Sequence, residues 1–174
     1  MKKLIIAMSL LGLFTGCKSQ NTDGDSPNKK TKKEIKMPQS KLLRVEYNYS
    51  GMMMEPFYNI ELYRNEEGKG PQLKFETQRQ EYSFEVSDTL FDAARRIIEE
   101  EKMYEYGVSY ELASDIQVLD GYAWRFYARF ENKEENIDSR GHQVSPDGNG
   151  LNRMRQLLYD AAEKCMEKIH PQQP

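Results

Sequence analysis

The stretch from Tyr122 to Phe130 constrains the fold of this chain more than any other segment. Apolar side chains occupy every second position, and polar ones lie between them: Tyr122, Trp124, Phe126, Ala128 and Phe130 against Arg125, Tyr127 and Arg129. This period of two places the two sets on opposite faces of a β-strand. Burial would contribute about 1.5–3 kcal/mol for each large apolar side chain. We therefore expect this segment to be the central strand of a sheet, with its apolar face against a covering layer.

Other segments with the same alternation supply further strands. Four of them follow one another, starting near Leu43, Tyr58, Leu73 and Tyr82, and short turn sequences separate them. Short connections predict an antiparallel meander. After a turn at Asn132–Asn136, the segment from Ile137 to Val144 predicts a strand that pairs with the Tyr122–Phe130 strand. Together these segments predict an antiparallel meander sheet of about six strands.

Two segments change to the spacing of a helix. Apolar residues recur at Leu90, Ala94, Ile97 and Ile98, and again along the stretch from Leu151 to Ile169. Each helix follows a group of strands, so the chain has the pattern of two strand-strand-helix pseudo-repeats. Two helices can cover only one face of a sheet of this width, so we expect an α+β fold in two layers with the other sheet face uncovered.

The first seventeen residues have a different character. Lys2 and Lys3 are followed by an apolar run from Leu4 to Phe14 and then by Thr15, Gly16 and Cys17. A positive start, an apolar run and a small-residue cleavage site are the three parts of a secretory signal peptide. The apolar run is shorter than the roughly 20 residues that a transmembrane helix needs. We therefore expect cleavage after residue 16 and not a permanent transmembrane anchor.

This segment resembles the signal peptide and lipobox of bacterial lipoproteins. The resemblance implies that the sulfur of Cys17 carries one lipid group with two acyl chains and that its amine is acylated after cleavage. Phe14 departs from the pattern, which has Leu, Val or Ile three positions before the cysteine, and a soluble secreted protein cut near Gly16 is the alternative. The domain also resembles small uncharacterised lipoproteins of Bacteroidetes, in the Asp120–Trp124 turn and strand and in the Asp147–Leu151 start of the last helix. That likeness implies no site residues.

The lipoprotein resemblance implies a cell-envelope location, at the outer membrane, and a division of the chain into four parts. Residues 1–16 are the signal peptide, 17–39 the lipidated cysteine and a flexible polar linker, 40–170 a single α+β domain and 171–174 a disordered tail. The linker carries six lysines. From Ser40 onward, 17 basic and 25 acidic residues give a net charge of −8. An acidic domain argues against nucleic acid as a partner, because phosphates require a basic surface.

Cysteine and histidine are scarce. The chain has two cysteines, so lipidation of Cys17 would leave Cys165 unpaired, and we expect Cys165 to be a buried thiol on the apolar face of the last helix. Asp138, Ser139 and His142 include the residue types of a hydrolytic triad, but on a strand Ser139 would point away from the other two. The two histidines have no metal-ligand spacing. The sequence therefore predicts no catalytic residue, metal or cofactor, and an Arg140 ion pair on a solvated strand face.

Two groups remain as candidate binding residues. The first comprises Arg125, Tyr127 and Arg129 on the outward face of the strongest strand, since Arg and Tyr are enriched at interfaces. The second comprises Met52, Met53 and Met54 between the first two strands. Two of these side chains could cover an edge of the core, or the three could form a flexible apolar loop that suits a partner surface. The leading hypothesis is a non-catalytic binding module with a protein or glycan partner in the envelope. An envelope enzyme acting on carbohydrate or cell-wall material and a structural envelope component are the alternatives.

Overall fold

The computed structural model describes residues 35–51, 57–64, 70–112 and 121–169. The chain divides into a unit at Met1–Lys33 and a second unit at Glu34–Pro174, which contains all of the described residues. The predicted signal peptide, Cys17 and the predicted tail at 171–174 lie outside the described residues, as do Met52, Met53 and Met54.

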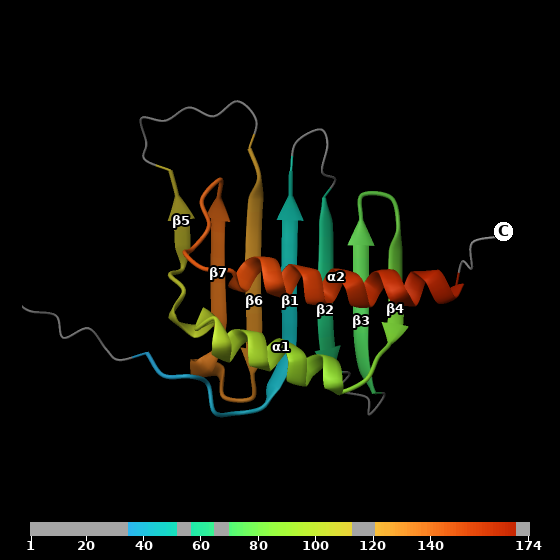
Figure 1. Ribbon diagram of the computed structural model, residues 1–174, viewed down its shortest axis with the longest axis horizontal. Helices are drawn as coiled ribbons and strands as arrows, with labels where there is room; N and C mark the ends of the chain where they lie inside the picture. Colours follow the sequence, from blue (N-terminus) through green and yellow to red (C-terminus); the bar gives the residue numbers. More distant parts are fainter. Residues whose placement is uncertain (1–34, 52–56, 65–69, 113–120, 170–174) are drawn as a thin grey trace, which may run out of the picture. The chain divides into compact units, whose positions relative to one another are not determined.

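The described residues form seven strands, two α-helices and two short 3₁₀ turns. The strands are β1 (Leu42–Ser50), β2 (Tyr58–Arg64), β3 (Pro71–Thr77), β4 (Glu81–Glu85), β5 (Ser109–Glu111), β6 (Ala123–Phe130) and β7 (Ile137–His142). The helices are α1 (Thr89–Glu100) and α2 (Gly150–Ile169), and the 3₁₀ turns are Met103–Glu105 and Lys133–Glu135. The strands form one sheet in the order β4-β3-β2-β1-β6-β7-β5 (Figure 1).

The predicted meander is confirmed for the first four strands, since β1 to β4 pair antiparallel in sequence order. The chain then returns to the free edge of β1, where β6 pairs antiparallel, and β7 pairs antiparallel with β6. The sheet has seven strands where about six were predicted. The short strand β5 lies within Tyr104–Ser114, an irregular stretch for which the sequence favours a short strand or a turn, and it pairs parallel with β7. The middle strand of the seven is β1, and β6 lies beside it.

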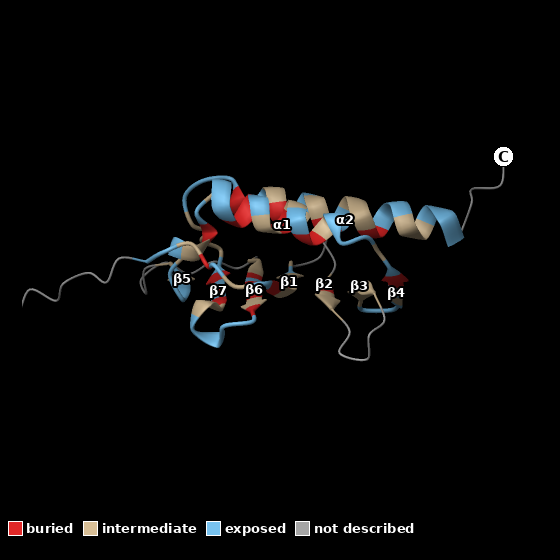
Figure 2. Ribbon diagram, turned by 90° about the horizontal axis from the view of Figure 1, so that it is seen from below, coloured by how far each residue is buried: buried red, intermediate tan, exposed pale blue. Residues whose placement is uncertain are grey.

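Both helices lie on the same face of the sheet, as predicted, and they run across its strands (Figures 1 and 2). The apolar spacing explains this packing: α1 buries Phe91, Ala94, Ile97 and Ile98, and α2 buries Leu151, Met154, Leu158 and Ala162. The strands bury alternate residues under these helices, including Val45, Ile60, Leu62, Leu73, Phe75, Phe84, Trp124, Phe126, Ala128 and Phe130. The fold is therefore a two-layer α+β domain whose core lies between the sheet and the helix layer.

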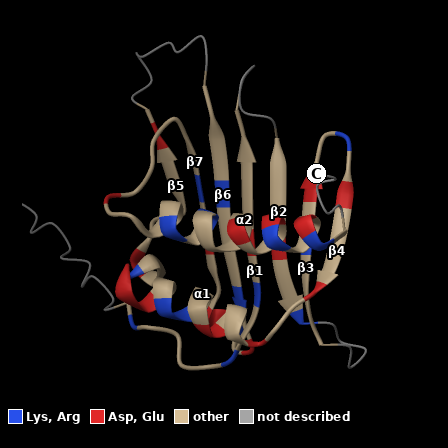
Figure 3. Ribbon diagram, turned by 45° about the vertical axis from the view of Figure 1, so that its right-hand side comes forward, with Lys and Arg blue, Asp and Glu red and all other residues tan. Residues whose placement is uncertain are grey.

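Outside the core, the two helices are joined by an ion-pair cluster. Arg153 of α2 contacts Glu100 at 2.7 Å and Glu101 at 2.6 Å, and its hydrogen bond to Glu101 lowers the pKa of that carboxyl below its ordinary value. Charged residues of both signs lie along both helices (Figure 3). The mixture of charges is typical of a solvated helix surface.

The packed chain begins within the stretch that the sequence assigned to the linker. Pro38 is buried and Met37 packs against the core. The Arg95 guanidinium of α1 donates hydrogen bonds to the carbonyl oxygens of Pro38 and Ser40 at 2.7 and 2.6 Å. At the other end of the domain, Cys165 is half-buried against the core and is thus less covered than predicted. The C-terminal end of α2 extends past the edge strand β4 (Figures 1 and 2).

Candidate functional site

The sheet face opposite the helices carries polar side chains, and among the described residues no helix covers it (Figure 2). The alternation that buries one set of strand residues projects the other set outward: Arg44, Glu46, Asn48, Asn59, Glu61, Tyr63, Gln72, Lys74, Glu76, Arg125, Tyr127, Arg129, Asp138, Arg140 and His142. The expectation of an open face is confirmed. We refer to it as the uncovered face.

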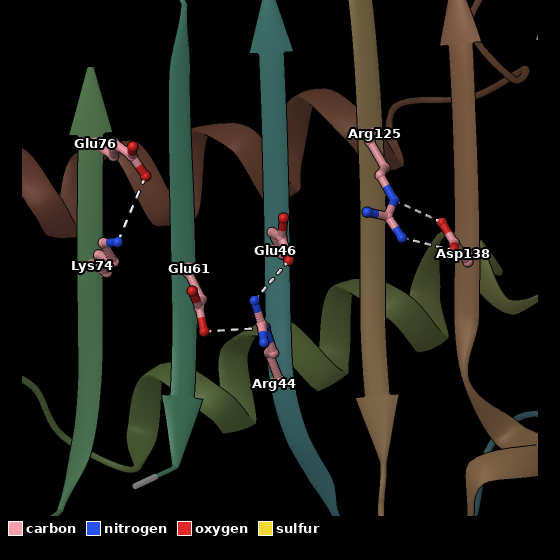
Figure 4. A network of polar contacts seen from close by, with 7 residues as sticks. All are labelled: Arg44, Glu46, Glu61, Lys74, Glu76, Arg125 and Asp138. Atoms are coloured by element: carbon pink, nitrogen blue, oxygen red, sulfur yellow. Dashed lines mark hydrogen bonds and ion pairs between the residues drawn. The ribbon is translucent and has the colours of Figure 1, made fainter. Parts of the chain in front are cut away.

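In the β1–β4 half of the uncovered face, each of two cations contacts two carboxylates, so the cations are paired and acidic groups are in excess (Figure 4). Arg44 contacts Glu46 at 3.0 Å and Glu61 at 3.1 Å. Lys74 contacts Glu76 at 3.6 Å and Glu81 at 3.1 Å. Burial raises the pKa of Glu61, and the charge of Arg44 opposes that shift. Partly exposed ion pairs of this kind contribute about 0–1 kcal/mol each, so this half of the face is an internally paired, solvated surface.

Arg125 of β6 is held by Asp138 of the neighbouring strand β7. The guanidinium donates two hydrogen bonds to the carboxylate, from Nε at 2.9 Å and from Nη2 at 2.8 Å. These bonds lower the pKa of Asp138 below its ordinary value. The same guanidinium carbon lies 5.5 Å from the ring centroid of Tyr127. In Figure 4 the third nitrogen of Arg125 points away from Asp138, so it can donate to a further acceptor.

A groove of about 300 Å³ lies at the corner of the uncovered face formed by β1, β6, β7 and β5. It is lined by Asn48, Ser109, Tyr110, Glu111, Ala123, Trp124, Arg125, Arg140, Gly141 and His142. Strand register assigns seven of these ten to the uncovered face, and Tyr110, Trp124 and Gly141 alternate with them along their strands. Side chains of the uncovered face therefore form its walls, and strand backbone forms its floor.

Strand pairing explains the shape of the groove. One row across the sheet contains Asn48, Arg125, Arg140 and Ser109, each opposite the next on a neighbouring strand. The following row contains Ser50, Ala123, His142 and Glu111. Because Ala123 has a single methyl group, it leaves the space beside His142 unfilled. Long side chains in the first row and a short one in the second produce the hollow.

The charges in the groove are arranged differently from the prediction. The expected Arg140 ion pair is wrong: Arg125 takes both oxygens of Asp138, and within the described segments Arg140 has no ion pair. The charge of Arg140 still reaches Asp138 and contributes to lowering the pKa of that carboxyl. Glu111 accepts a hydrogen bond from the Ser109 hydroxyl at 2.9 Å. The groove therefore presents an available cation at Arg140 and a hydrogen-bonded carboxylate at Glu111.

Of the residues that the sequence suggested for binding, Arg125 lines the groove. Tyr127 and Arg129 project from the same face but are half-buried farther along β6, outside the groove. Met52, Met53 and Met54 lie outside the described residues. The structure thus brings together a different set around Arg125, drawn from four strands.

The sequence missed Asn48, Ser109, Glu111 and Arg140 as binding candidates and weighed His142 only for catalysis and metal binding. One signal was available, because the predicted hairpin of β6 and β7 with a turn at Asn132–Asn136 would place Arg140 near Arg125. No sequence signal could show that β5 pairs with β7 from a distant part of the chain.

A hydrolytic triad does not form at His142. Ser139 is buried on the opposite face, as the alternation predicts, and donates a hydrogen bond to the carbonyl oxygen of Gly107 at 2.7 Å. Over the described ranges, no group of three or more His, Cys, Asp or Glu side chains converges as metal ligands. No helix in the described part of the chain is long and apolar enough to cross a membrane.

The class of this domain is defined by its architecture and its site, and not by similarity to known proteins. It is a two-layer α+β domain with an uncovered, grooved sheet face. The chain matches no protein-family model, and the search of curated proteins finds none similar to it.

Proposed function

We propose that this protein is a membrane-anchored envelope lipoprotein whose domain acts as a non-catalytic binding module through the uncovered face. The observation that carries the proposal is the groove of about 300 Å³, in which Arg125 and Arg140 lie directly opposite each other on neighbouring strands. In the β1–β4 half of the face Arg44 and Lys74 are each paired with carboxylates, whereas Arg140 at the groove has no ion pair among the described residues. An uncompensated Arg beside a hollow is a feature of binding surfaces.

The anchor rests on the sequence from Lys2 to Cys17 and on the linker that follows it. Lysines precede an apolar run that ends at a cysteine, and a polar stretch with six lysines separates that cysteine from the domain. One acyl chain binds a membrane only marginally, whereas two or three anchor a protein stably. Such an anchor would hold the domain at the outer membrane of the envelope, on its periplasmic or surface side.

The proposed lipid anchor predicts the mass of the mature protein. The protein extracted from membranes should begin at Cys17 and carry the added mass of two or three acyl chains, because the lipobox cysteine is both the cleavage and the acylation site. Intact-mass spectrometry of the extracted protein measures this directly. The matched control is Cys17→Ser, which should remain unacylated. A mature chain that begins elsewhere, or carries no acyl mass, would contradict the anchor.

An enzyme acting on carbohydrate or cell-wall material is the second candidate, because His142 and Glu111 line the same groove. Its chemistry would require a base within hydrogen-bond reach of a nucleophile or substrate proton. In the described segments the Ser109 hydroxyl donates to Glu111, and no hydrogen bond joins either group to His142. The arrangement therefore supports binding better than acid–base catalysis. A structural envelope component without a discrete ligand is the third candidate.

The binding proposal is tested by capture from envelope extract with the full-length protein. Arg140→Gln should abolish retention of a partner, protein or glycan, that the wild type holds, because it removes from the groove a positive charge that has no ion pair among the described residues. Arg96→Gln is the matched control, since Arg96 is exposed on α1, on the helix side of the sheet. The partner should be recovered chemically unchanged. Equal retention by the Arg140 variant would overturn the proposal, and cleavage of the partner would favour the enzyme instead.

A further inference from the structure

We infer that the ligand of the groove is an acidic carbohydrate, a sugar that carries one carboxylate among its hydroxyl groups. This inference rests on the proposed binding function and names its ligand class. It follows from the charge balance of the groove, from the mixture of donors and acceptors around it, and from its size.

The pairing of charges favours a ligand with one anionic group, because Arg140 has no ion pair among the described residues. Arg125 and Arg140 contribute two positive charges, and Asp138 and Glu111 two negative ones. Because Asp138 is already occupied by Arg125, the remaining cation is Arg140. A guanidinium binds a carboxylate through two parallel hydrogen bonds. A phosphate dianion would bring a second negative charge close to Glu111, which lies on the neighbouring strand β5.

The side chains of the first row can hold the ligand carboxylate in one position. Asn48, Arg125 and Arg140 are successive partners across β1, β6 and β7. The Asp138 carboxylate holds Arg125 by two hydrogen bonds, so its remaining nitrogen is oriented before any ligand arrives (Figure 4). A fixed donor lowers the entropic cost of binding. The Asn48 amide adds a donor and an acceptor beside the two guanidinium groups.

The second row suits hydroxyl groups. Glu111 is an acceptor for ligand O–H groups, and its position is restrained by the hydrogen bond from Ser109 at 2.9 Å. His142 can donate or accept a hydrogen bond. The short side chain of Ala123 leaves space between β1 and the side chains of His142 and Glu111. A volume of about 300 Å³ lies at the small end of ligand sites, which suits one or two sugar rings.

The test is a titration of the full-length protein followed by NMR chemical shifts of the backbone amides in β5, β6 and β7. Glucuronate and glucose form a matched pair, because they differ only in having a carboxylate or a hydroxymethyl group on the same ring. Saturable shifts with glucuronate are expected at concentrations at least tenfold lower than with glucose, acetate or inorganic phosphate. Acetate tests whether a carboxylate without a sugar ring is enough for binding, and phosphate tests whether any small anion binds.

Arg140→Gln should weaken glucuronate binding about tenfold or more, and Arg96→Gln should leave it unchanged. Both positions are exposed, so both variants are expected to fold. Equal binding of glucose and glucuronate, tighter binding of phosphate, or no effect of Arg140→Gln would overturn the inference. Capture of a partner that depends on Arg140, without glucuronate binding, would remove this inference and leave the proposed function standing. If neither partner capture nor glucuronate binding depended on Arg140, the inference and the proposed function would both be wrong.

Discussion

Replacing Phe126 with Ala should lower the free energy of unfolding by about 3–5 kcal/mol. Phe126 is fully buried on β6, between β1 and β7 and under the helix layer. Truncation removes most of its apolar side chain and leaves a cavity, which neighbouring strands cannot close because they are fixed by hydrogen bonds on both sides. Chemical denaturation followed by circular dichroism measures the change.

The neighbouring residue provides the control. Tyr127 is an aromatic residue of similar size on the same strand, but it projects from the uncovered face and is half-buried. Tyr127→Ala should cost about 1 kcal/mol or less, as expected for surface positions. The comparison tests the assignment of faces directly. If the two variants lost similar amounts of stability, the division of β6 into a core face and an uncovered face would be wrong.

Gly141→Ala should destabilise the domain by about 3 kcal/mol, at the upper end of the cost of overpacking. A Cβ at this position would overlap the Val144 carbonyl oxygen and the Trp124 indole more closely than real Cβ atoms approach their neighbours. The indole covers Gly141 and donates a hydrogen bond to that carbonyl at 2.8 Å. Since the carbonyl belongs to backbone and the ring is buried, neither can move without breaking this bond.

Trp124 reports the disturbance, because it is the chain's single tryptophan. Its fluorescence should shift to longer wavelength in the Gly141→Ala variant as the indole is displaced toward water, and the denaturation midpoint should fall. Gly107→Ala is the matched control: a Cβ there would lie 3.7 Å from the Tyr110 ring, which is an ordinary contact. Unchanged stability and fluorescence in the Gly141 variant would show that the indole does not pack as described.

The same packing connects the core to the groove. Gly141 lies between Arg140 and His142 on β7, and its missing side chain lets the Trp124 indole lie against the strand. The indole in turn packs beside Tyr110 of β5, with ring centroids 5.8 Å apart. The position of β5, which supplies one wall of the groove, therefore depends on aromatic contacts on the opposite side of the sheet.

Much of the fold followed from side-chain periodicity. Alternation at Leu43–Tyr49 and Tyr122–Phe130 identified β1 and β6, and helical spacing identified α1 and α2. Such patterns can be recognised within a short segment, because the buried face of a strand or helix is apolar along its length. The uncovered face followed as well, since two helices are too few to cover both sides of this sheet.

The sequence alone determined the elements, their buried faces and the resemblance of the first seventeen residues to a lipoprotein signal. Only the tertiary structure decided that β6 returns to pair with β1, that β5 joins β7 in parallel, and that Arg125, not Arg140, takes Asp138. These pairings bring together residues that are far apart in the chain, such as Asn48 and Arg125. A turn sets the register of a hairpin, but no short turn joins β1 to β6 or β5 to β7, so the register of these pairs depends on the packing of the whole domain. The groove is a product of that register.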